Sequence, residues 1–304
     1  MIGIDLGGTN VRAAAVAHDG TLGRVLIEPI DRRDEEPLEP FGQLVRLVGA
    51  LIAEAHDLPS GIGIGSTGPV HPGEGVIDNP FTLPPNLQGN VRDAIEGAFP
   101  VPVVLENDAN AAALGEYWRG AGRGAEALVC MTVGTGIGVG VVLRGVVHRG
   151  PRGVHPEAGH QIVDLGGPPC YCGAHGCVES LAAGPALIEA ARARDVICDS
   201  PAEVFERSFA GDAACREITS AAREAITAAS LNLVATHAAD VVLFSGGALG
   251  DPAGVIAGVQ AALDGFEFTP PGGTRVSLAE LSDLAGCYGA AYVALAAGAS
   301  RVAS

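Results

Sequence analysis

Apolar residues recur along this chain in two alternating patterns. Short runs in which apolar positions are continuous or alternate, as in β-strands, cover residues 2–16, 61–65, 101–105, 128–143 and 240–244. Longer runs with apolar residues three to four positions apart, as in amphipathic helices, cover residues 41–55, 182–194 and 213–239. Because strands and helices alternate in both halves of the chain, the pattern predicts an α/β fold.

Two of the strand runs are interrupted by glycine-rich turns. The first passes through Asp5-Leu6-Gly7-Gly8-Thr9-Asn10, and the second passes through Gly134-Thr135-Gly136-Ile137-Gly138. Each pattern is typical of a β-hairpin in which the second strand returns beside the first. Since one such hairpin lies in each half of the chain, the sequence indicates a duplicated domain.

The chain is long enough for two domains, because a typical domain has about 150 residues and this chain has 304. We expect an N-terminal α/β domain over residues 1–117, completed by a C-terminal helix near residues 286–304. A larger C-terminal α/β domain is expected over residues 118–285, and it contains the cysteine cluster described below.

The charge of the chain excludes several partners and chemistries. There are 18 Arg, no Lys and 35 Asp plus Glu, which gives a net charge of −17. Such a chain repels polyphosphate backbones and anionic lipid surfaces, so we expect no nucleic acid partner and no membrane partner. The absence of lysine also excludes a phosphate-binding lysine and Schiff-base chemistry. Any phosphate must therefore be bound by backbone amides, a metal ion or arginine.

Neither a membrane span nor an export signal is predicted. The two longest uncharged runs, residues 127–143 and 284–300, are rich in Gly or Ala, and both fall short of the roughly 20 apolar residues that a span needs. The first residues, Met1-Ile2-Gly3-Ile4, have the pattern of a strand and include no basic region or cleavage site. We therefore expect a cytoplasmic protein.

Three of the seven cysteines form a cluster with the spacing of metal ligands, at Cys170, Cys172 and Cys177. In a cytoplasmic chain, cysteines are expected to be thiols or metal ligands. Together with His160 they satisfy a tetrahedral structural zinc site, and the intervening glycines permit tight turns. His175 is the alternative fourth ligand, but it would have to fold back on its own turn. The other four cysteines are expected to be buried apolar residues: Cys130, Cys198, Cys215 and Cys287.

Three glycine turns that follow strands indicate a nucleotide site. The third is Ser245-Gly246-Gly247-Ala248. The first tip offers backbone amides that can cradle phosphate, while its carboxylate can hold Mg²⁺ through water. Any single turn has an ordinary hairpin as its alternative, but the set suits two phosphate clamps and an adenosine pocket. The candidate residues are Asp5, Gly7, Gly8, Thr9, Asn10, Gly134, Thr135, Gly136, Gly246 and Gly247.

A carboxylate is predicted where one strand ends and a helix begins. The strand at residues 101–105 leads into Glu106-Asn107-Asp108-Ala109-Asn110 and then into an Ala-rich helical stretch. Asp108 would therefore lie at a helix N-terminus, near the edge of the sheet. It is either a helix-capping residue or a general base that takes the proton of a hydroxyl attacking phosphorus.

Taken together, these motifs resemble the ROK family of sugar kinases, repressors and related proteins. The resemblance is carried by the two hairpin tips, the run from Glu106 to Asn110, Glu157-Ala158-Gly159-His160, and the run from Cys170 to Glu179. It covers nearly the whole chain. The resemblance implies an actin-like (ribonuclease H-like) ATPase fold, with two domains around a cleft that closes on ATP and a sugar.

The resemblance also implies roles for individual residues. Asp108 would be the base on a sugar hydroxyl, usually O6, of a hexose, with glucose as the leading substrate. ATP would supply the phosphoryl group, and Mg²⁺ would neutralise the charge of the phosphates. The side chains on the sugar ring would be Asn107, Glu157, His160 and Glu179. The ligands of the structural zinc ion would be His160, Cys170, Cys172 and Cys177. The expected assembly is a homodimer or homotetramer.

Two departures from the family pattern affect these expectations. Family kinases often have an Asn-Leu-x-x-Trp run, whereas this chain has Asp78-Asn79-Pro80 and then Asn86-Leu87 with no Trp. Asn79 is the preferred sugar ligand because it follows a strand, with Asn86 as the alternative. Repressor members carry a helix-turn-helix ahead of the first hairpin, which here starts at residue 2, so a DNA-binding role is not expected.

Two other functions remain as alternatives. An N-acetylmannosamine or N-acetylglucosamine kinase shares all of these motifs. A sugar-sensing regulator that binds without phosphorylating is the alternative of another class, but such a regulator has no need of the base that Asp108 provides.

Overall fold

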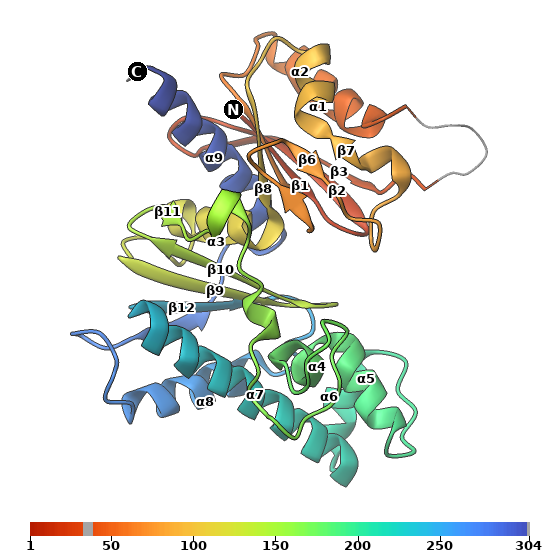
Figure 1. Cartoon of the computed structure of the whole chain (residues 1–304), viewed down its shortest axis with the longest axis vertical. Helices are drawn as coiled ribbons and strands as arrows, with labels where there is room; N and C mark the ends of the chain where they lie inside the picture. Colours follow the sequence, from red (N-terminus) through yellow and green to blue (C-terminus); the bar gives the residue numbers. More distant parts are fainter. Residues whose placement is uncertain (33–38, 303–304) are drawn as a thin grey trace. The chain divides into compact units, whose positions relative to one another are not determined.

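The computed structural model describes residues 1–32 and 39–302 (Figure 1). Its contacts group the chain into two compact units, which are described separately below. Unit 1 comprises residues 1–123, 145–156 and 283–304, and unit 2 comprises residues 124–144 and 157–282. The division into independent domains at residues 117 and 118 stays a prediction, and the last two residues of the expected C-terminal helix, 303–304, lie outside the described residues.

Unit 1 is built on a five-stranded sheet with the order β3-β2-β1-β4-β8. These strands are β1 (Ile2–Leu6), β2 (Asn10–Val16), β3 (Leu22–Pro29), β4 (Ile62–Ser66) and β8 (Val103–Asn107). Strands β1 and β2 form the predicted hairpin, while β1, β4 and β8 run parallel in register. The carboxyl ends of these three strands therefore meet at one edge, where ligands bind in open α/β sheets.

Helices cover both faces of this sheet. One face packs on α1 (Gly42–Ala55) and α2 (Val91–Ala98), and the other packs on α9 (Ala285–Val302). Helix α3 (Asp108–Arg119) follows β8 directly and packs on α9. A Cβ atom on Gly63 would lie 1.8 Å from the carbonyl oxygen of Ala290. Strand and helix backbones therefore touch, which only glycine permits at this position.

Short strands and 3-10 helices complete the described elements of the chain. Unit 1 has a second sheet of β5 (Val70–His71), β6 (Val76–Ile77) and β7 (Gly89–Asn90). Strand β11 (Val146–Val147) opens the segment 145–156. The 3-10 helices are η1 (Pro85–Leu87), η2 (Pro151–Gly153), η3 (Ala158–His160) and η4 (Ser282–Leu284).

Unit 2 repeats the strand order of unit 1. Its strands β9 (Ala127–Val133), β10 (Ile137–Leu143), β12 (Val241–Ser245) and β13 (Arg275–Leu278) lie in the order β10-β9-β12-β13. The first pair is antiparallel and the other two pairs are parallel, as for β2-β1-β4-β8. The expected duplication is confirmed at the level of topology.

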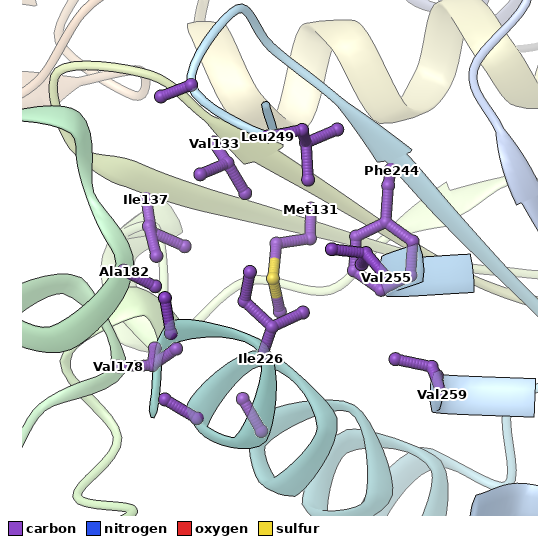
Figure 2. Close-up of a cluster of buried hydrophobic side chains, with 14 of the residues drawn as sticks. Met131, Val133, Ile137, Val178, Ala182, Ile226, Phe244, Leu249, Val255 and Val259 are labelled. Atoms are coloured by element: carbon purple, nitrogen blue, oxygen red, sulfur yellow. The ribbon is translucent and has the colours of Figure 1, made fainter. Parts of the chain in front are cut away.

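The core of unit 2 lies between its sheet and its helices (Figure 2). Met131 and Phe244 project from β9 and β12 toward Ile226 and Val255 of two helices, and all four side chains are buried. The helices are α4 (Val178–Ala182), α5 (Gly184–Arg192), α6 (Pro201–Ala210), α7 (Ala213–His237) and α8 (Pro252–Asp264). Within the described ranges, no helix combines the length and apolar character needed to cross a membrane.

Candidate active site

The first glycine turn links two loops of unit 1. In the turn between β1 and β2, the Gly7 N–H donates to the carbonyl oxygen of Asn10 at 3.1 Å. The Arg32 guanidinium donates to the carbonyl oxygens of Gly8 (2.7 Å) and Thr82 (2.6 Å). The turn is therefore held against the loop that follows Asn79, while Thr9 is exposed at its tip.

Asp5 lies opposite Arg12 on the neighbouring strand of the hairpin. A carboxylate oxygen of Asp5 is 3.5 Å from Arg12 Nη1, and Arg12 Nη2 is 3.1 Å from Asp283. Burial and the negative charge of Asp108 raise the pKa of Asp5 to about 7, although Arg12 opposes this shift. The carboxylates of Asp5 and Asp108 therefore repel each other within unit 1, and a bound cation would reduce this repulsion.

We expect Asp5→Asn to stabilise the ligand-free protein at alkaline pH. An unfolded aspartate loses its proton near pH 4, whereas folded Asp5 keeps its proton to about pH 7. The stability contribution of this group is therefore lost as pH rises from about 4 to 7. Because the Asp5 side chain is 18% exposed, we expect a gain of about 2 kcal/mol at pH 8, half of the maximum that the shift implies.

Thermal unfolding at pH 4 and pH 8 checks this expectation. The difference in Tm between Asp5→Asn and the unmodified protein should be large at pH 8 and small at pH 4. Asp19→Asn is the matched control, because a hydrogen bond from Thr21 lowers the pKa of Asp19. That control should give no gain at pH 8. A difference in Tm that is the same at both pH values contradicts the expected role of the Asp5 proton.

Asp108 is the first residue of α3, as predicted, and Asn107 is its N-cap. The Asn107 side chain accepts hydrogen bonds from the N–H groups of Ala109 (2.9 Å) and Asn110 (3.2 Å). Asn107 therefore caps α3, and Asp108 Oδ1 also accepts a hydrogen bond from the Ala109 N–H at 2.9 Å. The side chain is half-buried, and burial raises the pKa of Asp108 above its ordinary value.

Asn79 lies two residues beyond β6 and is fully buried. Its Oδ1 accepts from the N–H groups of Phe81 and Thr82, and its Nδ2 donates to Thr82 Oγ1 at 2.6 Å. The structure thus shows Asn79 shaping the loop that Arg32 ties to the first glycine turn. Contact of either Asn79 or the half-buried Asn86 with a sugar stays a prediction.

The second glycine turn is joined to Glu179. The Gly134 N–H donates to the carbonyl oxygen of Gly136 at 2.9 Å, and the Ile137 N–H donates to Glu179 Oε2 at 2.7 Å. A Cβ atom on Gly136 would lie 2.7 Å from that same oxygen. Glycine at this position therefore lets the carboxylate approach the backbone of the turn.

The third glycine turn packs on the second within unit 2. Gly246 has a φ of 104°, and a Cβ atom there would lie 2.1 Å from the carbonyl oxygen of Val133. Only glycine fits this conformation and this approach. Beside the turn is a pocket of 160 Å³ between Gly247 and α6, lined in part by Phe205 and the exposed Phe209. The lining thus combines two aromatic side chains with the backbone of the glycine turn.

Four predicted metal ligands come together in unit 2. The ligand atoms of His160, Cys170, Cys172 and Cys177 all lie within 4.8 Å of one another. Cys172 Sγ is 3.6 Å from Cys177 Sγ, and Cys170 Sγ is 3.4 Å from His160 Nδ1. A tetrahedral zinc ion with Zn–S bonds of about 2.3 Å needs sulfurs about 3.8 Å apart. The cluster therefore fits zinc, and the exposed His175 is not a member of it.

The Nε2 nitrogen of His160 faces the polar side chains of Tyr171 and Glu179. His160 Nε2 is 3.1 Å from the Tyr171 hydroxyl and 4.0 Å from Glu179 Oε1. The imidazole thus presents Nδ1 to the cysteines and Nε2 to a polar group that includes Glu179. Glu157 lies at the start of the 3-10 helix that carries His160. Its place on the sugar stays a prediction.

The structure therefore brings the predicted residues into two groups. Unit 1 holds the first glycine turn, Asp5, Asn107 and Asp108, while unit 2 holds the other two turns, the metal cluster and Glu179. Sequence reasoning missed Arg12 and Tyr171. Arg12 could have been found from the register of the predicted hairpin, which pairs it with Asp5. Tyr171 lies between Cys170 and Cys172 in the sequence, and this position indicates that it is near the cluster but not that it contacts His160.

Comparison with solved structures establishes the class of fold. The ROK hexokinase from Thermus thermophilus is 35% identical to this chain, with a TM-score of 0.87 over 99% of each chain. The chain therefore has the actin-like ATPase fold of such proteins. The model of the ROK family matches residues 1–297, and the chain belongs to the ROK family.

Curated relatives are similar over different shares of their length. The glucokinase of Thermotoga maritima is 36% identical over 190 residues, which are 62% of this chain and 58% of the relative. The N-acetylmannosamine kinase of Escherichia fergusonii is 32% identical over 264 residues, which are 86% of this chain and 87% of the relative. The chain thus spans less than two thirds of the glucokinase that it matches.

Proposed function

We propose that this protein transfers a phosphoryl group from ATP to the 6-hydroxyl of a hexose, with glucose as the substrate. The observation that carries this proposal is the position of Asp108, a desolvated carboxylate whose helix is already capped by its neighbour Asn107. A general base of raised pKa at the carboxyl edge of a sheet suits proton removal from an attacking hydroxyl. The hexokinase and glucokinase names of the similar proteins support the same reaction.

The proposed step is an in-line transfer. Asp108 accepts the proton of the sugar O6 as that oxygen forms a bond to the γ-phosphorus, and the bond from this phosphorus to the β–γ bridging oxygen breaks to release ADP. Backbone amides of the turns at residues 7–10 and 134–136 would receive the charge that develops on the phosphates. Mg²⁺ bound near Asp5 would neutralise part of that charge.

Residues of both units enter the proposal. We propose that Asn79 and Asn107 of unit 1, with Glu157, His160 and Glu179 of unit 2, hydrogen-bond the sugar. The adenine ring would occupy the pocket beside the Gly246 and Gly247 turn, where the exposed ring of Phe209 offers a stacking face.

We propose a structural role for zinc at the cysteine cluster. Four protein ligands, His160, Cys170, Cys172 and Cys177, would complete the tetrahedron and leave no open position for a reacting water. The ion would hold the imidazole of His160 in the orientation that presents Nε2 outward. That nitrogen is already within hydrogen-bond distance of a hydroxyl, that of Tyr171.

An N-acetylmannosamine kinase is the second candidate, since the relative of that name matches 86% of this chain. Glucose is preferred because the loop after Asn79 is short and closed by its own hydrogen bonds. We infer that such a closed loop favours a sugar without an acetamide group.

Coupled ADP-release kinetics over hexoses and N-acetylhexosamines test the proposal. We expect glucose to have the highest kcat/KM, with N-acetylglucosamine and N-acetylmannosamine well below it. If an N-acetylhexosamine leads, the substrate assignment is wrong and the kinase assignment stands. If no sugar releases ADP while glucose still binds in a calorimetric titration, the protein is a sugar-sensing regulator instead.

A further inference from the structure

A largely buried polar network lies at the junction of β8 and α3, where Asp108 is the first residue of the helix. Its members are Glu106 at the end of β8, Asn110 in the first turn of α3, and Arg149 and His155 from the segment 145–156. All four belong to unit 1. Glu106 and Asn110 are each 1% exposed, and His155 is 9% exposed. The proposed reaction uses none of these side chains.

Glu106 accepts hydrogen bonds on both carboxylate oxygens. Its Oε1 accepts from the Asn107 N–H at 3.0 Å and from Asn110 Nδ2 at 2.8 Å. Its Oε2 accepts from Arg149 Nε at 3.0 Å and also from Arg149 Nη2. A buried carboxylate is costly unless it is paired and hydrogen-bonded, and here Arg149 provides the opposite charge through two donors.

Chemistry fixes the direction of the remaining hydrogen bonds. An ionised carboxylate only accepts, so Asn110 must turn its amide nitrogen to Glu106 and its oxygen to His155. His155 Nδ1 lies 3.0 Å from that oxygen and must therefore carry the proton. Burial lowers the pKa of His155 to about 4, so the ring is neutral and its Nδ1–H is the donor at neutral pH.

The network holds the residues on either side of Asp108. Asn107 is bound through its N–H to Glu106, and Asn110 is bound through its side chain to Glu106 and His155. The Asn107 side chain in turn caps α3 at the N–H groups of Ala109 and Asn110. The backbone before and after the carboxylate is therefore restrained by hydrogen bonds that end on Arg149 and His155.

We propose that Arg149 and His155 are positioning residues for the Asp108 carboxylate, acting through Glu106 and Asn110. The proposal rests on the kinase function proposed above. A general base must lie within about 2.6–3.2 Å of its proton, and a displacement of 1 Å can cost about 100-fold in rate. Loss of either residue should therefore lower kcat more than it changes the KM for ATP.

His155→Phe and His155→Asn form the central comparison. Phenylalanine keeps a ring of similar size but removes the donor to Asn110, so we expect kcat to fall by about tenfold or more. Asparagine places its amide nitrogen where His155 Nδ1 lies relative to Cβ, so it should restore most of the lost kcat. Arg149→Lys keeps the charge but replaces the two donor nitrogens of the planar guanidinium by a single ammonium nitrogen, and it should also lower kcat.

Thr219→Val is the matched control for the loss of a buried hydrogen bond. Thr219 and Ser208 share a buried hydroxyl contact of 2.9 Å in unit 2. This variant should lower Tm to a similar degree as His155→Phe without changing kcat per folded molecule. If His155→Phe lowers Tm but leaves kcat unchanged, the positioning role is wrong. It is also wrong if His155→Asn fails to recover kcat.

Amide hydrogen exchange separates this proposal from the proposed function. In His155→Phe, exchange of the amides at residues 107–110 should accelerate at least severalfold, while exchange in β9 and β10 stays unchanged. His155→Asn should restore the slow exchange. Unchanged exchange at residues 107–110 would overturn the network's role even if the protein is a kinase. If exchange accelerates in His155→Phe but the unmodified protein turns over no sugar, the network's role stands and only the kinase function is overturned.

Discussion

Asp108→Asn is expected to abolish phosphoryl transfer while leaving sugar binding in place. The amide keeps the shape of the side chain and one acceptor, but it cannot take a proton from the sugar hydroxyl. General-base catalysis is typically worth about 10²- to 10⁴-fold, so kcat should fall by that factor. Helix α3 should persist, because its cap is Asn107 rather than Asp108. The measurements are steady-state kinetics and a calorimetric titration with glucose.

Asp93→Asn is the matched control, since Asp93 is also an acidic residue in the first turn of a helix of unit 1. Its kcat should be unchanged. The pH profile gives a second check on Asp108. Because burial raises its pKa, kcat of the unmodified protein should fall with acid at a pH above the ordinary aspartate range. Near-normal turnover of Asp108→Asn would remove this residue from the mechanism.

Loss of the metal cluster should weaken sugar binding by about 10- to 100-fold, the usual effect of disturbing the surroundings of a metal ligand. Cys172→Ser removes one of the four converging ligands, and exhaustive chelation removes any bound zinc. Without the ion, His160 loses the bond that would fix its ring most firmly, and the contact of its Nε2 with the Tyr171 hydroxyl remains. The orientation of the ring toward Glu179, whose Oε1 lies 4.0 Å from Nε2, is then less constrained. Titration of glucose against metal-depleted protein measures the loss.

ATP affinity should change less than sugar affinity. The bond from the Ile137 N–H to Glu179 involves no cluster residue, so the second glycine turn should keep its shape without the metal. Cys198→Ala is the control, because Cys198 is a buried thiol outside the cluster. That variant should retain its zinc content and its glucose affinity. If Cys172→Ser loses affinity for glucose and for ATP to the same degree, the cause is general unfolding. If its affinity for glucose is unchanged, the proposed link through His160 is wrong.

Features that depend on neighbouring residues could be predicted from the sequence. Both hairpins, the start of α3 at Asp108 and the grouping of the cysteines with His160 were predicted and are confirmed. Each of them follows from local chemistry: strand periodicity with glycine between, polar residues where a strand ends, or ligand spacing. The long helix predicted over residues 213–239 likewise ends within two residues of α7.

Features that depend on distant partners could not be predicted in this way. Arg149 lies 43 residues from Glu106, and an isolated arginine in a glycine-rich segment has the pattern of an exposed side chain. Asn79 is fully buried, and the hydrogen bond from its Nδ2 to the carbonyl oxygen of Thr67, 12 residues away, could not be predicted from the strand pattern. Its contact with a sugar stays a prediction. Local periodicity contains no information about which residues close such contacts.

The packing of α9 on the first sheet has a consequence for how the protein is made. The strands β1 and β4 leave the ribosome early, yet the face that contains Gly63 is covered by residues of α9, more than 200 positions later. Unit 2 ends at residue 282 and includes no part of α9. Since domains generally fold as units during synthesis, unit 2 can complete its core while the earlier sheet still exposes one apolar face. The sheet of unit 1 can therefore complete its packing only after α9 has been translated, although its own strands are among the first residues to be made.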